Sequence, residues 1–313
     1  MSAVASQRTD GDGRVSVSLA ELIAMRSRVA KLAVPRQETR ASRSGQQSSR
    51  MHGRGMDYAE SRIYQPGDDV RRLDWRLTAR SGKLHTKLFQ EEREGRLLIL
   101  IDNNPCMHFG TRARFKSVQA ARAAALAAWY AIRGGDRVGA ISFGQGEQLL
   151  RPQGGPRGAL AVCGALAEWD RRSATATGEE SLTDALARAR RLSHGASRVL
   201  IISDGWHGDV ELRGRLLDLA RYAEIGMLVV ADPLESNLAP AGRYPLEYDG
   251  KRIEVVLEAE RQQHEFQKKL SLGQARLSQL ARGLGLRCRT IDTTADPFDA
   301  VIALLGPDKR AAR

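Results

Sequence analysis

A chain of 313 residues with 42% hydrophobic and 27% charged residues has the composition of a globular protein with a buried core, and its length allows one large α/β domain or two ordinary ones. No run approaches the roughly 18 apolar residues of a transmembrane helix, and the polar N-terminus lacks the apolar stretch of a secretory signal. Three widely separated cysteines, Cys106, Cys163 and Cys288, form no CxxC pair, so we expect no disulfide framework and a reducing, cytoplasmic compartment.

The net charge of +12 favours polyanionic partners such as nucleic acid or acidic lipid headgroups. The basic residues are dispersed over predicted helix faces and mixed with acidic ones, and aromatic residues make up only 5% of the chain. Single-strand binding needs aromatic rings interleaved with the basic residues. Nucleic-acid or polyanion binding is therefore an alternative rather than the leading hypothesis.

The first part of the chain is predicted to be poor in regular structure. Residues 1–16 are expected to be disordered, and residues 35–54 read as an exposed polar loop. Between them, residues 18–32 predict a short amphipathic helix with Ser18 as N-cap. Its apolar side is expected to comprise Leu19, Leu22, Ile23, Val29 and Leu32. Residues 53–94 have many turn residues and predict short strands and loops packed on the main domain.

From Arg96 onward, strand and helix patterns alternate. Strands are predicted at residues 97–101, 137–143, 147–151, 199–202, 227–231 and 287–291. Helices are predicted at residues 115–133, 159–169, 182–192, 211–224, 259–284 and 298–305. This order predicts a Rossmann-like, mostly parallel sheet with helices on both faces. We divide the chain into a basic N-terminal region (1–49), an elaboration (50–95) and an α/β domain (96–306).

The sequence contains no familiar catalytic motif. A P-loop, GxSxG and HExxH are absent, and the glycines near residue 53 lack the strand and helix of a dinucleotide-binding fingerprint. Ligands of open parallel sheets bind at the carboxyl ends of the strands, here residues 102–108, 203–208 and Asp232. A zinc site from Asp102, Cys106, His108 and His207 is one alternative, but the spacing of the first three on one loop is unfavourable. We predict no catalytic residue.

Residues 54–80, which include YQPGDDVRRLDWRLTAR, carry a specific resemblance. This stretch resembles the signature YxPGDDxRxxDWRxTAR of the bacterial "domain of unknown function fifty-eight" family. The resemblance continues through residues 97–139, Ile202-Ser203-Asp204 and Asp232-Pro233, and covers about residues 50–305. It implies a von Willebrand factor A-like domain with an N-terminal elaboration. It also implies an adaptor role beside a MoxR-type AAA+ ATPase, or its client, in complex assembly or maturation.

The von Willebrand A resemblance implies a divalent-ion site built on a DxSxS loop, a Thr and a further Asp. The matching segment here is Asp102-Asn103-Asn104-Pro105-Cys106, so Asn104 and the soft thiol of Cys106 replace the serines. No Thr stands clearly at the second position, whereas Asp204 fits the third. Asp102, Asn104 and Asp204 thus form a degenerate Mg²⁺ site, with no cofactor required. Alternatively, both aspartates cap turns, or they serve a metal-dependent hydrolase that lacks an evident general base.

Two sets of residues are candidate partner contacts. At the strand ends these are Cys106, Met107, His108, Trp206 and His207, which alternatively pack as lids on the domain's own surface. In the elaboration they are Asp68, Asp69, Arg72, Trp75 and Arg76. The favoured alternative for that segment is an ion-pair network that fastens it to the sheet, with Asp68 and Asp69 capping a turn. Trp75 is expected to be buried in either case.

Overall fold

The computed structural model describes residues 10–32, 56–91, 95–144, 148–173, 179–192, 198–248 and 251–306. The chain divides into two compact units. The larger comprises residues 1–36 and 95–313, and the smaller comprises residues 37–94. The predicted polar loop at residues 35–54 lies outside the described residues.

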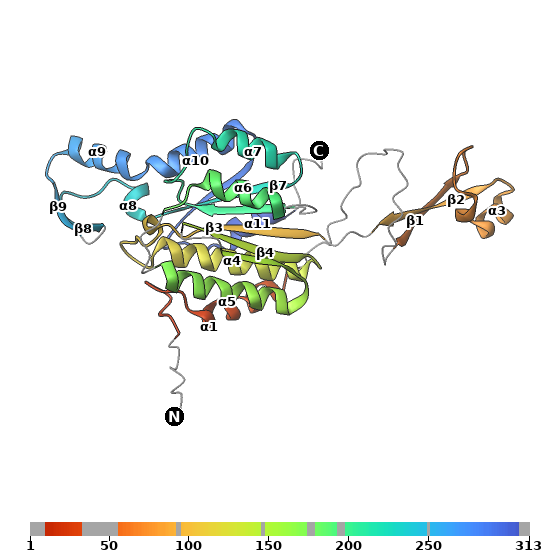
Figure 1. Ribbon diagram of the computed structural model, residues 1–313, viewed down its shortest axis with the longest axis horizontal. Helices are drawn as coiled ribbons and strands as arrows, with labels where there is room; N and C mark the ends of the chain where they lie inside the picture. Colours follow the sequence, from red (N-terminus) through yellow and green to blue (C-terminus); the bar gives the residue numbers. More distant parts are fainter. Residues whose placement is uncertain are drawn as a thin grey trace, which may run out of the picture. The chain divides into compact units, whose positions relative to one another are not determined.

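A six-stranded sheet forms the centre of the larger unit (Figure 1). Its strands are β3 (Arg96–Asp102), β4 (Arg137–Phe143), β5 (Gln148–Gln153), β6 (Arg198–Ser203), β7 (Glu224–Ala231) and β10 (Arg287–Asp292). Their order is β10-β7-β6-β3-β4-β5, and every pair is parallel except β4–β5. The central strands are continuous apolar runs because helices cover both of their faces. The predicted mostly parallel α/β fold is confirmed.

Helices bury the two faces of this sheet in separate cores (Figure 1). On one face lie α1 (Leu19–Ala24), α2 (Arg26–Ala30), α4 (Lys116–Arg133), α5 (Gly155–Ser173) and α11 (Phe298–Leu305). On the other face lie α6 (Leu182–Leu192), α7 (Leu212–Ala220) and α10 (Leu272–Gly283). Within β3 the alternation of the strand sends Leu97 and Ile99 to the first core and Leu98 and Leu100 to the second.

Residues 10–16, part of the segment predicted to be disordered, have defined contacts. Asp12 accepts hydrogen bonds from the backbone N–H groups of residues 14, 15 and 16 and so closes a turn within the segment expected to be disordered. The predicted helix is interrupted at Met25, between α1 and α2. Leu22 and Val29 are buried in a core of the larger unit, whereas Leu19 and Ile23 remain 36% and 38% exposed. The apolar stripe is therefore narrower than the predicted one.

An arm follows β7 at the carboxyl edge of the sheet (Figure 1). It contains α8 (Pro233–Ser236), the antiparallel hairpin of β8 (Gly242–Tyr248) and β9 (Lys251–Leu257), and α9 (Glu260–Leu270). Gln267 of α9 donates a hydrogen bond to the carbonyl of Ser236 at the end of α8. The predicted long helix at 259–284 is thus two helices that meet at Ser271, and sequence reasoning missed the hairpin.

The smaller unit is built on one hairpin. Strands β1 (Met56–Ile63) and β2 (His85–Glu91) pair antiparallel, and the connection between them holds the 3-10 turn η1 (Val70–Arg72) and α3 (Trp75–Ser81). Asp74 caps α3 by accepting from the Leu77 N–H, and it also accepts from the Ser61 hydroxyl of β1. Gly82, with φ of 70°, supplies the left-handed residue that ends the helix.

Candidate functional site

The side chains of the predicted metal-binding loop after β3 form hydrogen bonds with neighbouring segments of the chain. Asp102 is fully buried, and its Oδ1 accepts from the backbone N–H (3.0 Å) and the side-chain amide (2.8 Å) of Asn104. Its Oδ2 accepts from the Ser203 hydroxyl at 2.6 Å. The Asn104 amide also exchanges two hydrogen bonds of 3.0 Å with the backbone of Glu180. These contacts join the loop after β3 to the end of β6 and to the segment before α6.

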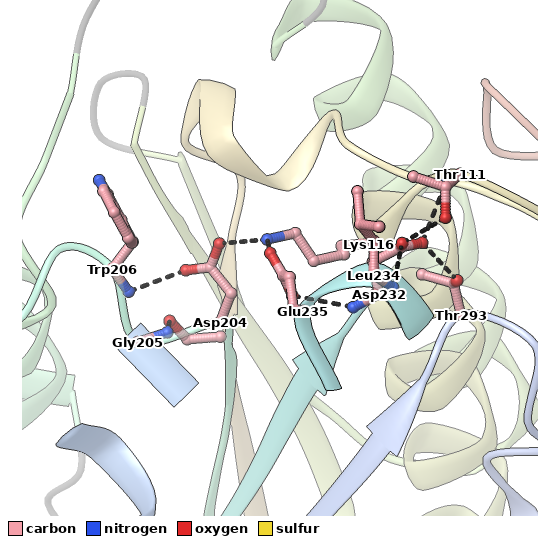
Figure 2. A network of polar contacts seen from close by, with 10 residues as sticks. Thr111, Lys116, Asp204, Gly205, Trp206, Asp232, Leu234, Glu235 and Thr293 are labelled. Carbon is pink, nitrogen blue, oxygen red and sulfur yellow. Dashed lines mark hydrogen bonds and ion pairs between the residues drawn. The ribbon is translucent and has the colours of Figure 1, made fainter. Parts of the chain in front are cut away.

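Lys116, the first residue of α4, provides a buried positive charge at the same edge. Its Nζ lies 2.8 Å from Asp204 Oδ2 and 2.7 Å from Glu235 Oε1, and Figure 2 shows the ammonium between the two carboxylates. The three side chains are only 4%, 6% and 8% exposed. The remaining oxygen of Asp204 accepts from the Trp206 N–H at 2.9 Å. The ammonium therefore links α4 to the loops that follow β6 and β7.

Asp232 also connects several segments at the carboxyl edge of the sheet (Figure 2). With Glu235 it forms a capping box at the start of α8, because Asp232 accepts from the Leu234 N–H and Glu235 Oε2 accepts from the Asp232 N–H. Asp232 also accepts from the backbone N–H and hydroxyl of Thr111 and from the hydroxyl of Thr293. The capping box thereby holds Glu235 in position to meet Lys116.

Burial and charge set the protonation of the cluster. Burial, reinforced by the charge of Asp204, raises the pKa of Asp102 to about 7. Burial opposes charge on Lys116, but Asp204 and Glu235 outweigh it and raise the lysine pKa above its usual value. Burial likewise opposes the charge on Asp204, whose pKa is nevertheless lowered by Lys116, whereas burial prevails at Glu235 and raises its pKa. The stable arrangement is an ammonium paired with the Asp204 carboxylate.

The residues present do not fit the predicted Mg²⁺ site. Each side-chain oxygen of Asp102, Asn104 and Asp204 already accepts a hydrogen bond from a protein donor. Burial also raises the pKa of the Cys106 thiol, which keeps it protonated and a poor ligand for a hard cation. Among the described residues, no group of three or more His, Cys, Asp or Glu side chains is arranged to hold a metal.

The predicted zinc ligands are likewise not arranged around a common site among the described residues. His108 Nε2 lies 3.8 Å from Asp170, and His207 Nδ1 lies 3.8 Å from Glu179. The two histidines thus face different carboxylates on different segments. The hydrolase alternative gains no general base either, because both oxygens of Asp102 are engaged by Asn104 and Ser203.

The predicted strand-end contacts differ widely in exposure. Met107 is completely buried in the core and cannot meet a partner, which corrects its prediction as a contact. Cys106, His108 and His207 are partly covered. Trp206 is 48% exposed, and its backbone follows Gly205, whose φ of 79° and close approach to Gly273 leave no room for a side chain.

The structure also shows the exposure and the hydrogen bonds of the predicted partner contacts in the smaller unit. Trp75 is 67% exposed, so the expectation that it is buried is wrong. It is the first residue of α3, in the connection between the two strands of the hairpin. Asp68 accepts from Arg62 at 2.7 Å and from the Gln65 N–H, while Asp69 caps η1. Arg72 and Arg76 are exposed.

Sequence reasoning missed Lys116, Glu235, Thr111 and Thr293. The spacing of Asp232 and Glu235 around a proline is a readable capping-box signal that would have placed Glu235 at the edge. Lys116 carries no such signal. A lysine at the start of an alanine-rich helix has the pattern of a solvated residue, and its partners are 88 and 119 residues away.

Several solved structures resemble this chain at low identity. A conserved hypothetical protein BatB from Bacteroides thetaiotaomicron is 14% identical, with a TM-score of 0.44, over 66% of this chain and 95% of that one. An aerotolerance-related membrane protein from Bacteroides fragilis is 14% identical, with a TM-score of 0.44, over 67% and 96%. A von Willebrand factor type A protein from Catenulispora acidiphila is 13% identical, with a TM-score of 0.36, over 60% and 43%.

The prediction of a cytoplasmic location is corrected by these comparisons. The Bacteroides fragilis structure is described as a membrane protein, and a further similar structure, from Vibrio fischeri, as a membrane-spanning protein. None of the helices described for this chain is long and apolar enough to cross a bilayer. We assign no compartment to the chain.

Sequence relatives and a family model agree with the motif in residues 54–80. Uncharacterized proteins of Mycobacterium bovis and Mycobacterium tuberculosis are each 27% identical over 263 residues, which cover 83% of this chain and 82% of the relative. The model of the family described as "Protein of unknown function DUF58" matches residues 60–276. The chain therefore belongs to the DUF58 family, and its larger unit is an α/β fold on a mostly parallel sheet.

Proposed function

We propose that the protein is a non-catalytic interaction protein that docks, through the carboxyl edge of its sheet, on a MoxR-type AAA+ ATPase or on that ATPase's client. The observation that carries the proposal is the exposed Trp206 on a fixed turn. The Trp206 N–H is held by Asp204, and Gly205 packs against Gly273. A large aromatic side chain on a preorganised backbone is the usual anchor of a protein interface, because little entropy is lost when it binds.

The chemistry of the edge supports a role without catalysis. The Cys106 thiol is a poor nucleophile because burial raises its pKa. Lys116 is held as an ammonium by two carboxylates, so it offers no free amine. Asp102 and Asn104 are engaged in bracing three loops. These groups stabilise a surface rather than activate a substrate.

The test is a calorimetric titration of a purified MoxR-type AAA+ ATPase with this protein, after the latter has been treated with EDTA. Trp206→Ala should weaken binding at least about tenfold, as expected for an aromatic anchor. Tyr222→Ala is the matched control, because Tyr222 is 64% exposed and precedes β7 at the opposite, amino edge of the sheet. Equal effects of the two substitutions would reject the carboxyl edge. No binding of the wild-type chain, with nucleotide present, would reject the ATPase as its partner.

Polyanion binding remains a second candidate because one pocket is lined with arginines. Ala187, Arg190 and Arg191 of α6 and Arg215 of α7 line it. Guanidinium groups suit phosphate oxygens, and such binding weakens steeply as salt rises. We expect Arg191→Gln with Arg215→Gln to reduce both retention on heparin and its salt dependence. Weak retention of the wild-type chain that does not respond to salt would exclude this candidate.

A further inference from the structure

We propose that the Lys116 ammonium is the resident cation of the carboxyl edge, standing in for the divalent ion of a von Willebrand A-type site, and that a metal site is latent beneath it. The predicted metal ligands contact hydrogen-bond donors of the protein instead of an ion. The oxygens of Asp102 and Asn104 are committed to protein donors, so they are not arranged around an ion. The positive charge of the cluster instead comes from a side chain of the protein itself.

The contacts of Lys116 are those that a bound cation would make. Its Nζ meets Asp204 Oδ2, from the loop after β6, at 2.8 Å and Glu235 Oε1, from α8 after β7, at 2.7 Å. Because Lys116 itself begins α4, which follows the β3 loop, the ammonium joins three segments through one charge. It also lies 5.6 Å from the centre of the Phe109 ring, which favours a cation.

The local charge explains why a divalent ion has no place in the wild-type chain. Asp204 is the carboxylate that a metal and the ammonium would both require, and Lys116 is covalently attached to the chain with only 4% of its side chain exposed. A divalent ion would be repelled by the buried Lys116 ammonium. It would also have to displace that ammonium from Asp204 and Glu235, the carboxylates that neutralise it. The inference does not depend on the proposed partner, because it concerns the ion content of the purified chain.

Removing the ammonium should reveal the latent site. In Lys116→Ser, Asp204 Oδ2 and Glu235 Oε1 lose their donor and leave two carboxylate oxygens facing a space that water and an ion can enter. Such hard oxygens bind Mn²⁺. By calorimetry and by Mn²⁺ electron paramagnetic resonance, we expect about one bound Mn²⁺ per chain in this variant and none in the wild type. Adding Asp204→Asn to the variant should abolish the binding.

The control is Lys268→Ser, which removes an exposed lysine of α9 and should bind no Mn²⁺. A folded Lys116→Ser variant, with a native circular dichroism spectrum, that binds no Mn²⁺ would overturn the proposal. So would stoichiometric Mn²⁺ binding to the wild type.

A second measurement decides the question if the serine variant does not fold. Side-chain ¹⁵N spectra of the wild type should show a slowly exchanging ammonium signal that added Mn²⁺ does not broaden. The absence of such a signal, or its selective broadening by the paramagnetic ion, would refute the assignment.

Discussion

The pairing of Lys116 with Asp204 makes a quantitative prediction about stability. Lys116→Met keeps much of the side-chain volume but removes the charge, and so leaves the Asp204 carboxylate buried with two neutral donors, the Trp206 N–H and the Cys106 thiol. Breaking a buried ion pair by deleting one partner costs about 3–5 kcal/mol. Single domains unfold with about 5–15 kcal/mol, so the variant should fold but lose a large share of its stability. The melting temperature should fall on the order of 10 °C.

A double-mutant cycle separates this pairing from general damage to the core. Asp204→Asn removes the stranded charge while its amide oxygen can still accept from the Trp206 N–H. The double variant with Lys116→Met should therefore be more stable than the sum of the two single losses predicts. We expect a coupling free energy of roughly 2–3 kcal/mol, the upper part of the range for contacting residues.

The assay is urea unfolding followed by tryptophan fluorescence, with the free energy of unfolding extrapolated to water for all four proteins. Losses that add to within about 0.5 kcal/mol would mean that the two residues are not coupled. That result would refute the reading of Lys116 as the counter-ion of Asp204.

Two further substitutions test the carboxyl edge. The folded-state pKa of Asp102, about 7, lies above its unfolded value of about 4, so its contribution to stability is complete below about pH 4 and is lost as pH rises through 7. Asp102→Asn should therefore flatten the stability profile between about pH 4 and 7 relative to wild type, and an unchanged slope in urea titrations would contradict the assignment. Gly205→Ala places a side chain on a residue with φ of 79°, and its Cβ would collide with the Gly273 carbonyl, so the substitution should cost at least about 2 kcal/mol. Gly135→Ala, at φ of 87° with open space, should cost only about 1 kcal/mol, and equal losses in thermal melts would argue against the packing at Gly273.

Local patterns predicted most of the sheet and its helices. The apolar runs at residues 97–101 and 199–202 are strands because only a strand covered on both faces tolerates unbroken apolar residues over so short a length. The helix predicted at 115–133 begins one residue later, at Lys116. The hairpin of β8 and β9 was missed although its sequence alternates, with Arg243 and Glu254 on one face and Tyr244, Leu246 and Ile253 on the other. That alternation is the pattern of a strand with one apolar face and was a readable signal, although Pro245 interrupts the first strand.

The candidate site was predicted in position but not in chemistry. Asp102 and Asp204 lie at strand ends that converge because parallel strands of one sheet present their carboxyl ends together. Which group neutralises them depends on long-range contacts that spacing does not encode. Trp75 illustrates the same limit, since nothing in the residues around this tryptophan indicates that its side chain is 67% exposed.

A tethered ammonium and a bound divalent ion offer different things to a partner. A divalent ion with an open coordination position can accept a carboxylate from another protein. Lys116 offers no such position, because its side chain is 4% exposed and its ammonium is already shared by two carboxylates. A partner at this edge must therefore gain affinity from side chains that reach the surface, of which Trp206 is the largest at the strand ends. Recognition by the partner should then depend on apolar contact and shape. Removing divalent ions from this protein should leave that recognition unchanged.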